Sequence, residues 1–168
     1  MLKGIDARIG PDLLRALARM GHGDEIVVSD ANFPSAAVAR HTVAQTELRI
    51  DCDAVAALRA ILSLLPIDSF EPDPVLTMQV VDDPAAVPAV VAEAVPLLAA
   101  EGLRPAALER FAFYDRARRG FAVLRTAETR PYGNFILRKG VISARVKVRD
   151  AATYPVTANE RAAPARAA

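Results

Sequence analysis

Apolar residues recur at helical spacing in some segments of the chain and form short continuous runs in others. Between Pro11 and Met20, four apolar side chains fall on one helical face, and the proline suits the first turn of a helix. Gly21 then provides a C-terminal stop. A later helix takes Asp51 or Asp53 as its N-cap. The other segments predicted to be helical are 51–65, 84–101 and the second half of 109–120.

The continuous apolar runs predict short strands, several of them buried on both faces. These runs occupy 25–29, 47–50, 75–81, 121–126 and 134–137. A loop is predicted at Asn32–Pro34 and a turn at Arg130–Gly133, where Asn, Pro and Gly interrupt the apolar pattern. Because short strands alternate with helices throughout, the pattern predicts layered α/β architecture.

The bulk composition is that of an ordinary globular protein. The 168 residues, 52% hydrophobic and 24% charged, are enough for one domain with a core. A net charge of +1 gives no reason to expect nucleic acid or a membrane as partner. The apolar region 85–100 is broken by Pro88, Glu93 and Pro96, so it is too short to span a bilayer, and its prolines must start, split or kink the helix. With no signal-peptide pattern, the expected location is the cytoplasm.

Cys52 is the only cysteine, which rules out an intramolecular disulfide and fits a reducing compartment. The neighbouring Asp51 and Asp53 disfavour a thiolate, so a structural thiol is the favoured interpretation.

The last 26 residues, Ser143–Ala168, differ from the rest in being rich in Ala, Arg and Pro. Their five cations and two anions give a net charge of +3. A strand is conceivable over 144–148, and disorder is expected beyond Asp150. A nucleic-acid-binding tail is the alternative, but the scattered cations without aromatic residues argue against it.

Familiar catalytic signatures are missing from the sequence. It contains no P-loop, no Gly-x-Gly-x-x-Gly, no Gly-x-Ser-x-Gly elbow and no Cys/His pattern for zinc. Nothing in the residues implies a cofactor or a metal.

The strongest candidate for chemistry is His22, which lies between Gly21 and Gly23 just before the strand 25–29. An uncovered imidazole titrates near neutral pH and can both give and take a proton. The structural alternative is a histidine that merely suits the C-terminal end of a helix dipole. Asp30 closes the same strand, and a loop cap or a functional carboxylate explains it equally well. At about 3.3 Å per residue, the strand separates His22 from Asp30 too far for direct contact within one subunit.

Three blocks of the chain, together with Leu64–Asp68, resemble the ribose pyranase/L-fucose mutarotase family in order and spacing. The blocks are Met20–Pro34 (MGHGDEIVVSDANFP), Glu109–Ala117 (ERFAFYDRA) and Tyr132–Val141 (YGNFILRKGV). The resemblance covers residues 1–142, which we therefore treat as the domain, with 143–168 as an extension. The aromatic Phe-Ala-Phe-Tyr sequence favours the fucose branch.

The resemblance implies a three-layer α/β/α protein with a central mixed sheet that exchanges sugar anomers without metal or cofactor. Ring opening and closure of a hemiacetal require one proton donor and one acceptor, each acting in both directions. Carried over by position, His22 is the proton donor, and a tyrosine is a candidate for the second carrier. The family also implies a homo-oligomer with sites near subunit boundaries. The residues carried over as sugar-binding are Asp30, Asp68, Arg110, Tyr114, Tyr132 and Asn134.

Two alternatives remain open at this point. The protein could act as a D-ribose pyranase by the same ring opening, because Gln79 falls at a variable position and leaves the choice of sugar undetermined. It could instead be a non-catalytic sugar-binding accessory protein of a transport system. The region 82–107 does not match the family in detail, and the resemblance says nothing about the extension.

Overall fold

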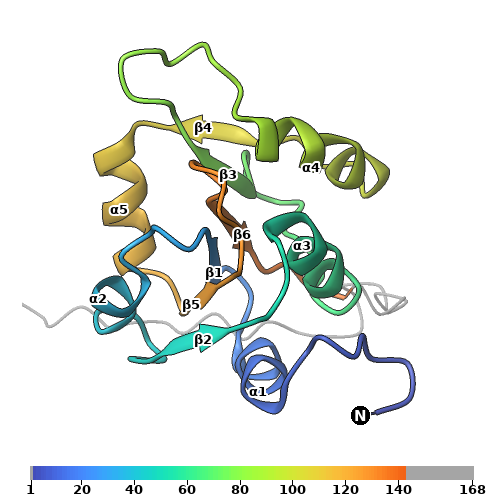
Figure 1. Cartoon of the computed structure of the whole chain (residues 1–168). Coiled ribbons are helices and arrows are strands. Elements are labelled where there is room, and N and C mark those ends of the chain that lie inside the picture. The colour runs from blue at the N-terminus through green and yellow to red at the C-terminus, as the bar shows by residue number, and fades with distance from the viewer. Residues whose placement is uncertain (1, 143–168) are drawn as a thin grey trace, which may run out of the picture.

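The computed structural model describes residues 2–142, which form a six-stranded sheet with helices on both faces (Figure 1). The strand order is β2-β5-β1-β6-β3-β4. The elements are α1 (Pro11–Arg19), β1 (Glu25–Ser29), α2 (Ser35–Ala39), β2 (Glu47–Arg49), α3 (Ala54–Leu62), β3 (Val75–Met78), α4 (Ala89–Ala100), β4 (Ala106–Leu108), α5 (Arg110–Arg118), β5 (Ala122–Arg125) and β6 (Phe135–Arg138).

The sheet is mixed because β6 runs antiparallel to both of its neighbours, β1 and β3, while every other pair is parallel. Glu25 therefore pairs with Arg138 at one end of β1, and Val28 pairs with Phe135 near the other. The carboxyl end of β1 thus lies beside the amino end of β6. At the opposite ends of these strands, the amino end of β1 lies beside the carboxyl end of β6.

Side chains of the central strands alternate between two cores, as the period of a strand requires. Ile26 and Val28 of β1 pack with α1, α3 and α4, whereas Val27 packs with α2 and α5. Figure 1 shows the same division, with α2 and α5 on one side of the sheet and the other three helices on the opposite side. The three-layer α/β/α class with a mixed sheet is confirmed.

Most predicted elements are present, with shifted ends. Asp53 rather than Asp51 caps α3, through a 2.7 Å hydrogen bond from the amide of Ala56. The helix predicted over 84–101 begins only at Ala89, because Pro88 holds an extended backbone and Asp82 turns the preceding segment with φ 63°. Pro96 lies inside α4 at an exposed position.

Two elements, α2 and β4, have no counterpart among the predicted ones. Both are short, at five and three residues, so neither shows a readable period. The described residues contain no helix of the length and apolarity that crossing a bilayer demands. The strand and the disorder predicted within 143–168 lie outside the described residues.

Gly140 offers a sharp test of how the end of β6 packs. A Cβ at this position would lie 2.6 Å from the carbonyl oxygen of Ile67 and 2.8 Å from the Cα of Asp68. Because backbone rather than a flexible side chain occupies that space, Gly140→Ala is expected to destabilise the protein by about 1–3 kcal/mol. Urea unfolding checks this. Gly21→Ala, where a Cβ would meet only Oδ2 of Asp24 at an ordinary 3.7 Å, is the control, and an equal loss there would contradict the packing argument.

Candidate active site

Five of the seven predicted site residues line one small pocket at the carboxyl end of β1. The pocket has a volume of about 220 Å³, and Phe33 and Met78 contribute apolar surface to it. Its volume is below the roughly 300–1,000 Å³ of pockets for drug-sized ligands, as suits a smaller molecule. The predicted residues that line it are Asp30, Arg110, Tyr114, Tyr132 and Asn134.

Asp30 is buried at the pocket wall and held by three hydrogen bonds to its carboxylate. Its Oδ1 accepts from the amides of Asn32 and Phe33, both at 2.9 Å, which turns the chain directly after β1. Its Oδ2 accepts from Nδ2 of Asn134 at 2.8 Å, and the amide of Asp30 donates back to Oδ1 of Asn134 at 3.1 Å. A carboxylate has about four lone-pair sites, so one remains on Oδ2 for a ligand hydroxyl.

The first turn of α5 supplies the cationic side of the pocket. Glu109 caps this helix by accepting from the amides of Phe111 and Ala112, at 2.8 and 3.0 Å. Arg110 and Tyr114 follow four residues apart and so share one face. The guanidinium of Arg110 lies 5.9 Å from the Tyr114 ring, which stacks on Phe33 at 5.2 Å. Arginine and aromatic faces of this kind suit a polar ring with several hydroxyls.

Tyr132 reaches the pocket from the loop between β5 and β6. Its backbone is left-handed, with φ 62°, and its hydroxyl accepts a 3.2 Å hydrogen bond from the amide of Val81. The adjacent Gly133 is packed so closely that a Cβ there would lie 2.8 Å from Cγ of Glu128. The predicted turn is therefore present, but the left-handed residue in it is the tyrosine.

Glu128 is the buried anchor of that loop. Its carboxylate accepts hydrogen bonds from the backbone amide and the guanidinium of Arg130 at 2.7–2.9 Å. The same guanidinium donates to the carboxylate of Glu93 on α4 at 2.6 Å. The side-chain hydrogen bonds from Arg130 lower the pKa of Glu128 to about 2, outweighing the opposing effect of burial. The loop that carries Tyr132 and Asn134 is thus tied to α4.

Because the folded pKa of Glu128 lies below the ordinary value of about 4.5, the anchor contributes its stability above that value and loses it as the pH falls toward 2. Glu128→Gln is expected to cost about 1.5–3 kcal/mol at neutral pH and to flatten the dependence of stability on pH in that acid range. Urea unfolding at several pH values measures both. The exposed Glu101→Gln is the matched control, and an equal effect of both substitutions would contradict the assignment.

His22 and Asp68 lie together at the amino end of β1, opposite the end that carries the pocket. Nε2 of His22 is 3.1 Å from Oδ1 of Asp68, and Nε of Arg138 donates to Oδ2 of Asp68 at 3.0 Å. The carboxylate of Asp68 has no exposed surface, whereas the His22 side chain is 45% exposed. Burial alone would raise the pKa of Asp68, but hydrogen bonds from the Phe70 amide, His22 and Arg138 outweigh it and lower that pKa.

The glycines around His22 allow its turn to dock on the end of β6. Gly23 is left-handed, with φ 85°, and its amide donates to the carbonyl of Lys139 at 2.8 Å. A Cβ on Gly23 would lie 3.3 Å from Nη2 of Arg138, so glycine lets the guanidinium lie close beneath the turn. Asp24 closes the turn by accepting from the amide of Gly21 at 2.7 Å.

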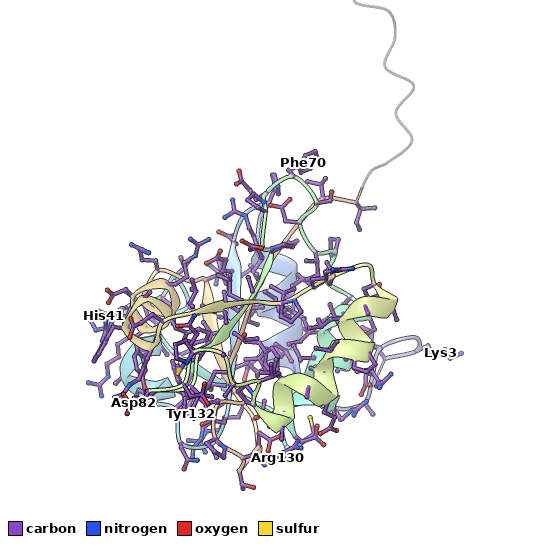
Figure 2. All side chains as sticks on the ribbon, turned by 90° about the horizontal axis from the view of Figure 1, so that it is seen from above. Lys3, His41, Phe70, Asp82, Arg130 and Tyr132 are labelled. Carbon is purple, nitrogen blue, oxygen red and sulfur yellow. The ribbon has the colours of Figure 1, made fainter. Side chains whose placement is uncertain are left out.

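The His22–Asp68 pair and the Asp30 pocket are separate within one chain. The five residues of β1 lie between them and span about 16 Å at 3.3 Å per residue. Figure 2 shows the separation, since Phe70, whose ring lies 5.5 Å from that of His22, is at one end of the molecule and Tyr132 is at the other. The predicted lack of contact between His22 and Asp30 in one chain agrees with the structure.

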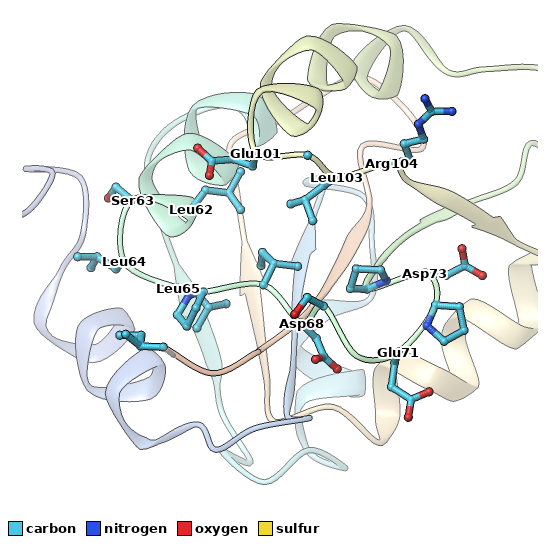
Figure 3. Close-up of a pocket in the computed structure, with 17 residues that line it drawn as sticks. Leu62, Ser63, Leu64, Leu65, Asp68, Glu71, Asp73, Glu101, Leu103 and Arg104 are labelled. Carbon is cyan, nitrogen blue, oxygen red and sulfur yellow. The ribbon is translucent and has the colours of Figure 1, made fainter. Parts of the chain in front are cut away.

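A larger groove of about 800 Å³ borders the loop that carries Asp68 (Figure 3). Its ionisable side chains include Glu71, Asp73, Glu101 and Arg104, and Asp68 is the only predicted site residue on its wall. The residues expected to recognise a sugar therefore gather in the smaller pocket, and we place the candidate active site there and at His22.

Arg138 contacts Asp68 but was not among the site residues predicted from the sequence. A cation at the end of an otherwise apolar strand was the available signal, but its partner Asp68 lies 70 residues away in the sequence.

Comparisons with known proteins identify the family to which this chain is related. Residues 3–142 match the model of the RbsD / FucU transport protein family. The chain is 43% identical over 148 residues to the fucose mutarotase of Homo sapiens, covering 84% of this chain and 95% of the relative. It is 42% identical over 145 residues to the L-fucose mutarotase of Histophilus somni, covering 84% and 97%.

A solved structure supports the same relationship. The fucose mutarotase of Streptococcus pneumoniae in complex with L-fucose superposes with a TM-score of 0.73 at 37% identity, over 84% of this chain and 99% of that one. The family match extends over residues 3–142, nearly all of the described chain, and this range contains every candidate site position. This chain therefore belongs to the RbsD/FucU family.

Proposed function

We propose that the protein is a sugar isomerase that interconverts the α and β anomers of L-fucose. The observation that carries the proposal is the pocket at the end of β1, in which a buried carboxylate, an arginine and two tyrosines surround a small cavity. Its relatives at 42–43% identity are fucose mutarotases, and a structural relative holds L-fucose. Anomer exchange needs proton transfer at two oxygens, which these side chains can support without a redox step.

In this proposal, each residue has a role that its contacts allow. The free lone pair of Asp30 accepts a sugar hydroxyl, and Asn134 holds Asp30 in place. Arg110 and Tyr114 bind or orient the sugar from α5, and Tyr132 does so from the opposite loop. His22 gives a proton to the ring oxygen as the ring opens and takes it back from the resulting hydroxyl as the ring closes, while a tyrosine is the candidate that accepts and returns the proton of the anomeric hydroxyl. Asp68, which was expected to bind the sugar, instead faces Nε2 of His22.

We further propose that the working site joins two copies of this chain, with the pocket of one copy completed by His22 of the next. The separation of the two regions by β1 supports this arrangement, because a proton carrier must reach its substrate. Both regions also carry an exposed aromatic side chain, Phe70 beside His22 and Phe111 beside Arg110, with 69% and 67% of their surface accessible. Exposed aromatic residues are typical of protein interfaces.

The two alternatives are not favoured. A D-ribose pyranase would use the same proton chemistry, but the relatives from Homo sapiens and Histophilus somni, at 42–43% identity, carry the name of fucose mutarotases. A non-catalytic accessory protein would need the sugar pocket but no exposed histidine. We place the protein in the cytoplasm, since its single thiol, half-buried at Cys52, suits a reducing compartment.

Saturation-transfer NMR tests the proposed function directly. With the full chain at catalytic concentration, exchange between the anomers of L-fucose should exceed the buffer rate, and exchange of D-ribose and D-galactose forms should be slower. Faster pyranose–furanose exchange of D-ribose would favour the pyranase. No exchange above buffer for any of the three sugars would overturn the proposal.

A further inference from the structure

We infer that Asp68 and Arg138 are positioning residues for His22, and that Nδ1 of His22 is the atom that exchanges protons with the sugar. The inference rests on the proposed function for the identity of the substrate. It assigns Asp68 a role through the histidine instead of a direct contact with sugar.

The surroundings of Asp68 leave little room for a ligand. Its Oδ1 lies 3.1 Å from both Nε2 of His22 and the amide nitrogen of Phe70, and its Oδ2 accepts from Arg138. The side chain has no accessible surface, although Asp68 belongs to the wall of the larger groove. One lone pair remains on Oδ2, as in Asp30, but because the Asp68 side chain has no accessible surface a sugar hydroxyl could reach it only if a neighbouring group moved, whereas the imidazole already has access to solvent.

The pairing also determines which nitrogen of His22 carries a proton. Ionised Asp68 can only accept hydrogen bonds, so the Nε2 that faces it must carry a hydrogen. In the neutral ring, Nδ1 is then the basic nitrogen. Nδ1 makes no hydrogen bond to any residue between 2 and 142, and nearly half of the His22 side chain is exposed. The free nitrogen is therefore the one that can take and return the proton of a bound sugar.

Arg138 fixes the orientation of Asp68 by donating a hydrogen bond to Oδ2, the carboxylate oxygen that does not face His22. Its Nη1 lies 3.7 Å from Oε1 of Glu25, a buried carboxylate at the start of β1. Glu25 also accepts a 2.7 Å hydrogen bond from Nε of Arg116 on α5. Starting from His22, the charged groups follow in the order Asp68, Arg138, Glu25 and Arg116, so that carboxylates and guanidinium groups alternate. Two anions and two cations balance, and the central pair, Glu25 and Arg138, lies on the adjacent strands β1 and β6.

This arrangement follows the logic of a general base oriented by a carboxylate. The carboxylate selects the tautomer and fixes the plane of the ring, and the chemistry takes place at the other nitrogen. The backbone supports the placement, because Asp68 donates its amide to the carbonyl of Arg138 at 3.0 Å. The two residues are therefore neighbours in the main chain pairing as well as through their side chains.

The decisive measurement is the tautomer of His22 by ¹⁵N-detected NMR on the full chain. The chain has only two histidines, so a His41→Gln variant assigns the signals. In the wild-type protein the neutral ring should carry its proton on Nε2. A wild-type ring with its proton on Nδ1 would overturn the inference, and this result needs neither a variant that folds nor any catalysis.

Asp68→Asn then tests the consequence for catalysis. An amide offers one acceptor oxygen, which cannot serve both His22 and Arg138, so the Nε2–H population should fall. We expect kcat for L-fucose exchange to drop at least about tenfold, because general acid–base catalysis contributes about 10²–10⁴-fold and depends on orientation. KM should change by less than about twofold, since ground-state binding is untouched. The matched control is Asp115→Asn, which removes an exposed carboxylate on α5 and should change neither quantity.

The outcomes separate the two possible roles of Asp68. A raised KM with unchanged kcat and an unchanged tautomer would make Asp68 a sugar ligand and overturn the inference. Absence of exchange in the wild-type protein with every sugar would refute the proposed function, while the tautomer measurement would still decide the pairing of Asp68 with His22.

Discussion

Replacing His22 with alanine is expected to abolish catalysed exchange of L-fucose anomers while the fold survives. General acid–base catalysis contributes about 10²–10⁴-fold, so the rate above buffer should fall by at least about 10²-fold. The fold should persist because the imidazole is 45% exposed and because Asp68 keeps its hydrogen bonds from Arg138 and the Phe70 amide. Saturation-transfer NMR on L-fucose measures the rate, and urea unfolding measures the stability.

His41→Ala is the matched control for this loss. His41 is the only other histidine and is exposed beyond α2, away from the pocket lining. The variant should exchange L-fucose anomers at the wild-type rate. If the His22 variant retained exchange comparable to that of the His41 variant, His22 would not be the proton carrier.

The second large effect is restoration of activity when two inactive variants are combined. His22→Ala removes the proton carrier, and Asp30→Asn removes the carboxylate of the pocket while its Oδ1 still accepts the amides of Asn32 and Phe33. Each variant alone should be inactive. If each site takes His22 from one copy and Asp30 from its neighbour, co-expression in equal amounts should restore about a quarter of wild-type activity in a symmetric assembly.

The L-fucose exchange rate is measured on the whole co-expressed mixture. Differently tagged copies then allow the mixed assemblies to be purified, and their activity should exceed that of the mixture. Assemblies containing only one variant are the controls, and they should remain at the buffer rate. If every copy held a complete site, each copy in the mixture would still lack one residue, and the mixed assemblies would stay inactive. Isolation of an active monomer would equally contradict the shared site.

Local patterns in the sequence were sufficient to predict the helices and strands in which apolar residues recur with a clear period. The helix α1 begins at Pro11 as predicted, and β1 has the predicted bounds, because turn residues flank both apolar segments. The α/β class follows from such segments, since each one must bury its apolar face against another layer. The edge strand β4 was not predicted, because its three residues are stabilised by pairing with β3, which no local period reports.

The sequence by itself thus determined which side chains could do chemistry: an uncovered histidine between glycines, a carboxylate that ends a strand, and polar residues in turns. Only the tertiary structure decided how they group. It pairs Asp30 with Asn134, 104 residues away, and His22 with Asp68 and Arg138 at the other edge of the sheet. The physical reason is that β6 runs antiparallel to β1, so its two ends meet opposite ends of β1, and such pairing depends on the whole sheet rather than on local spacing.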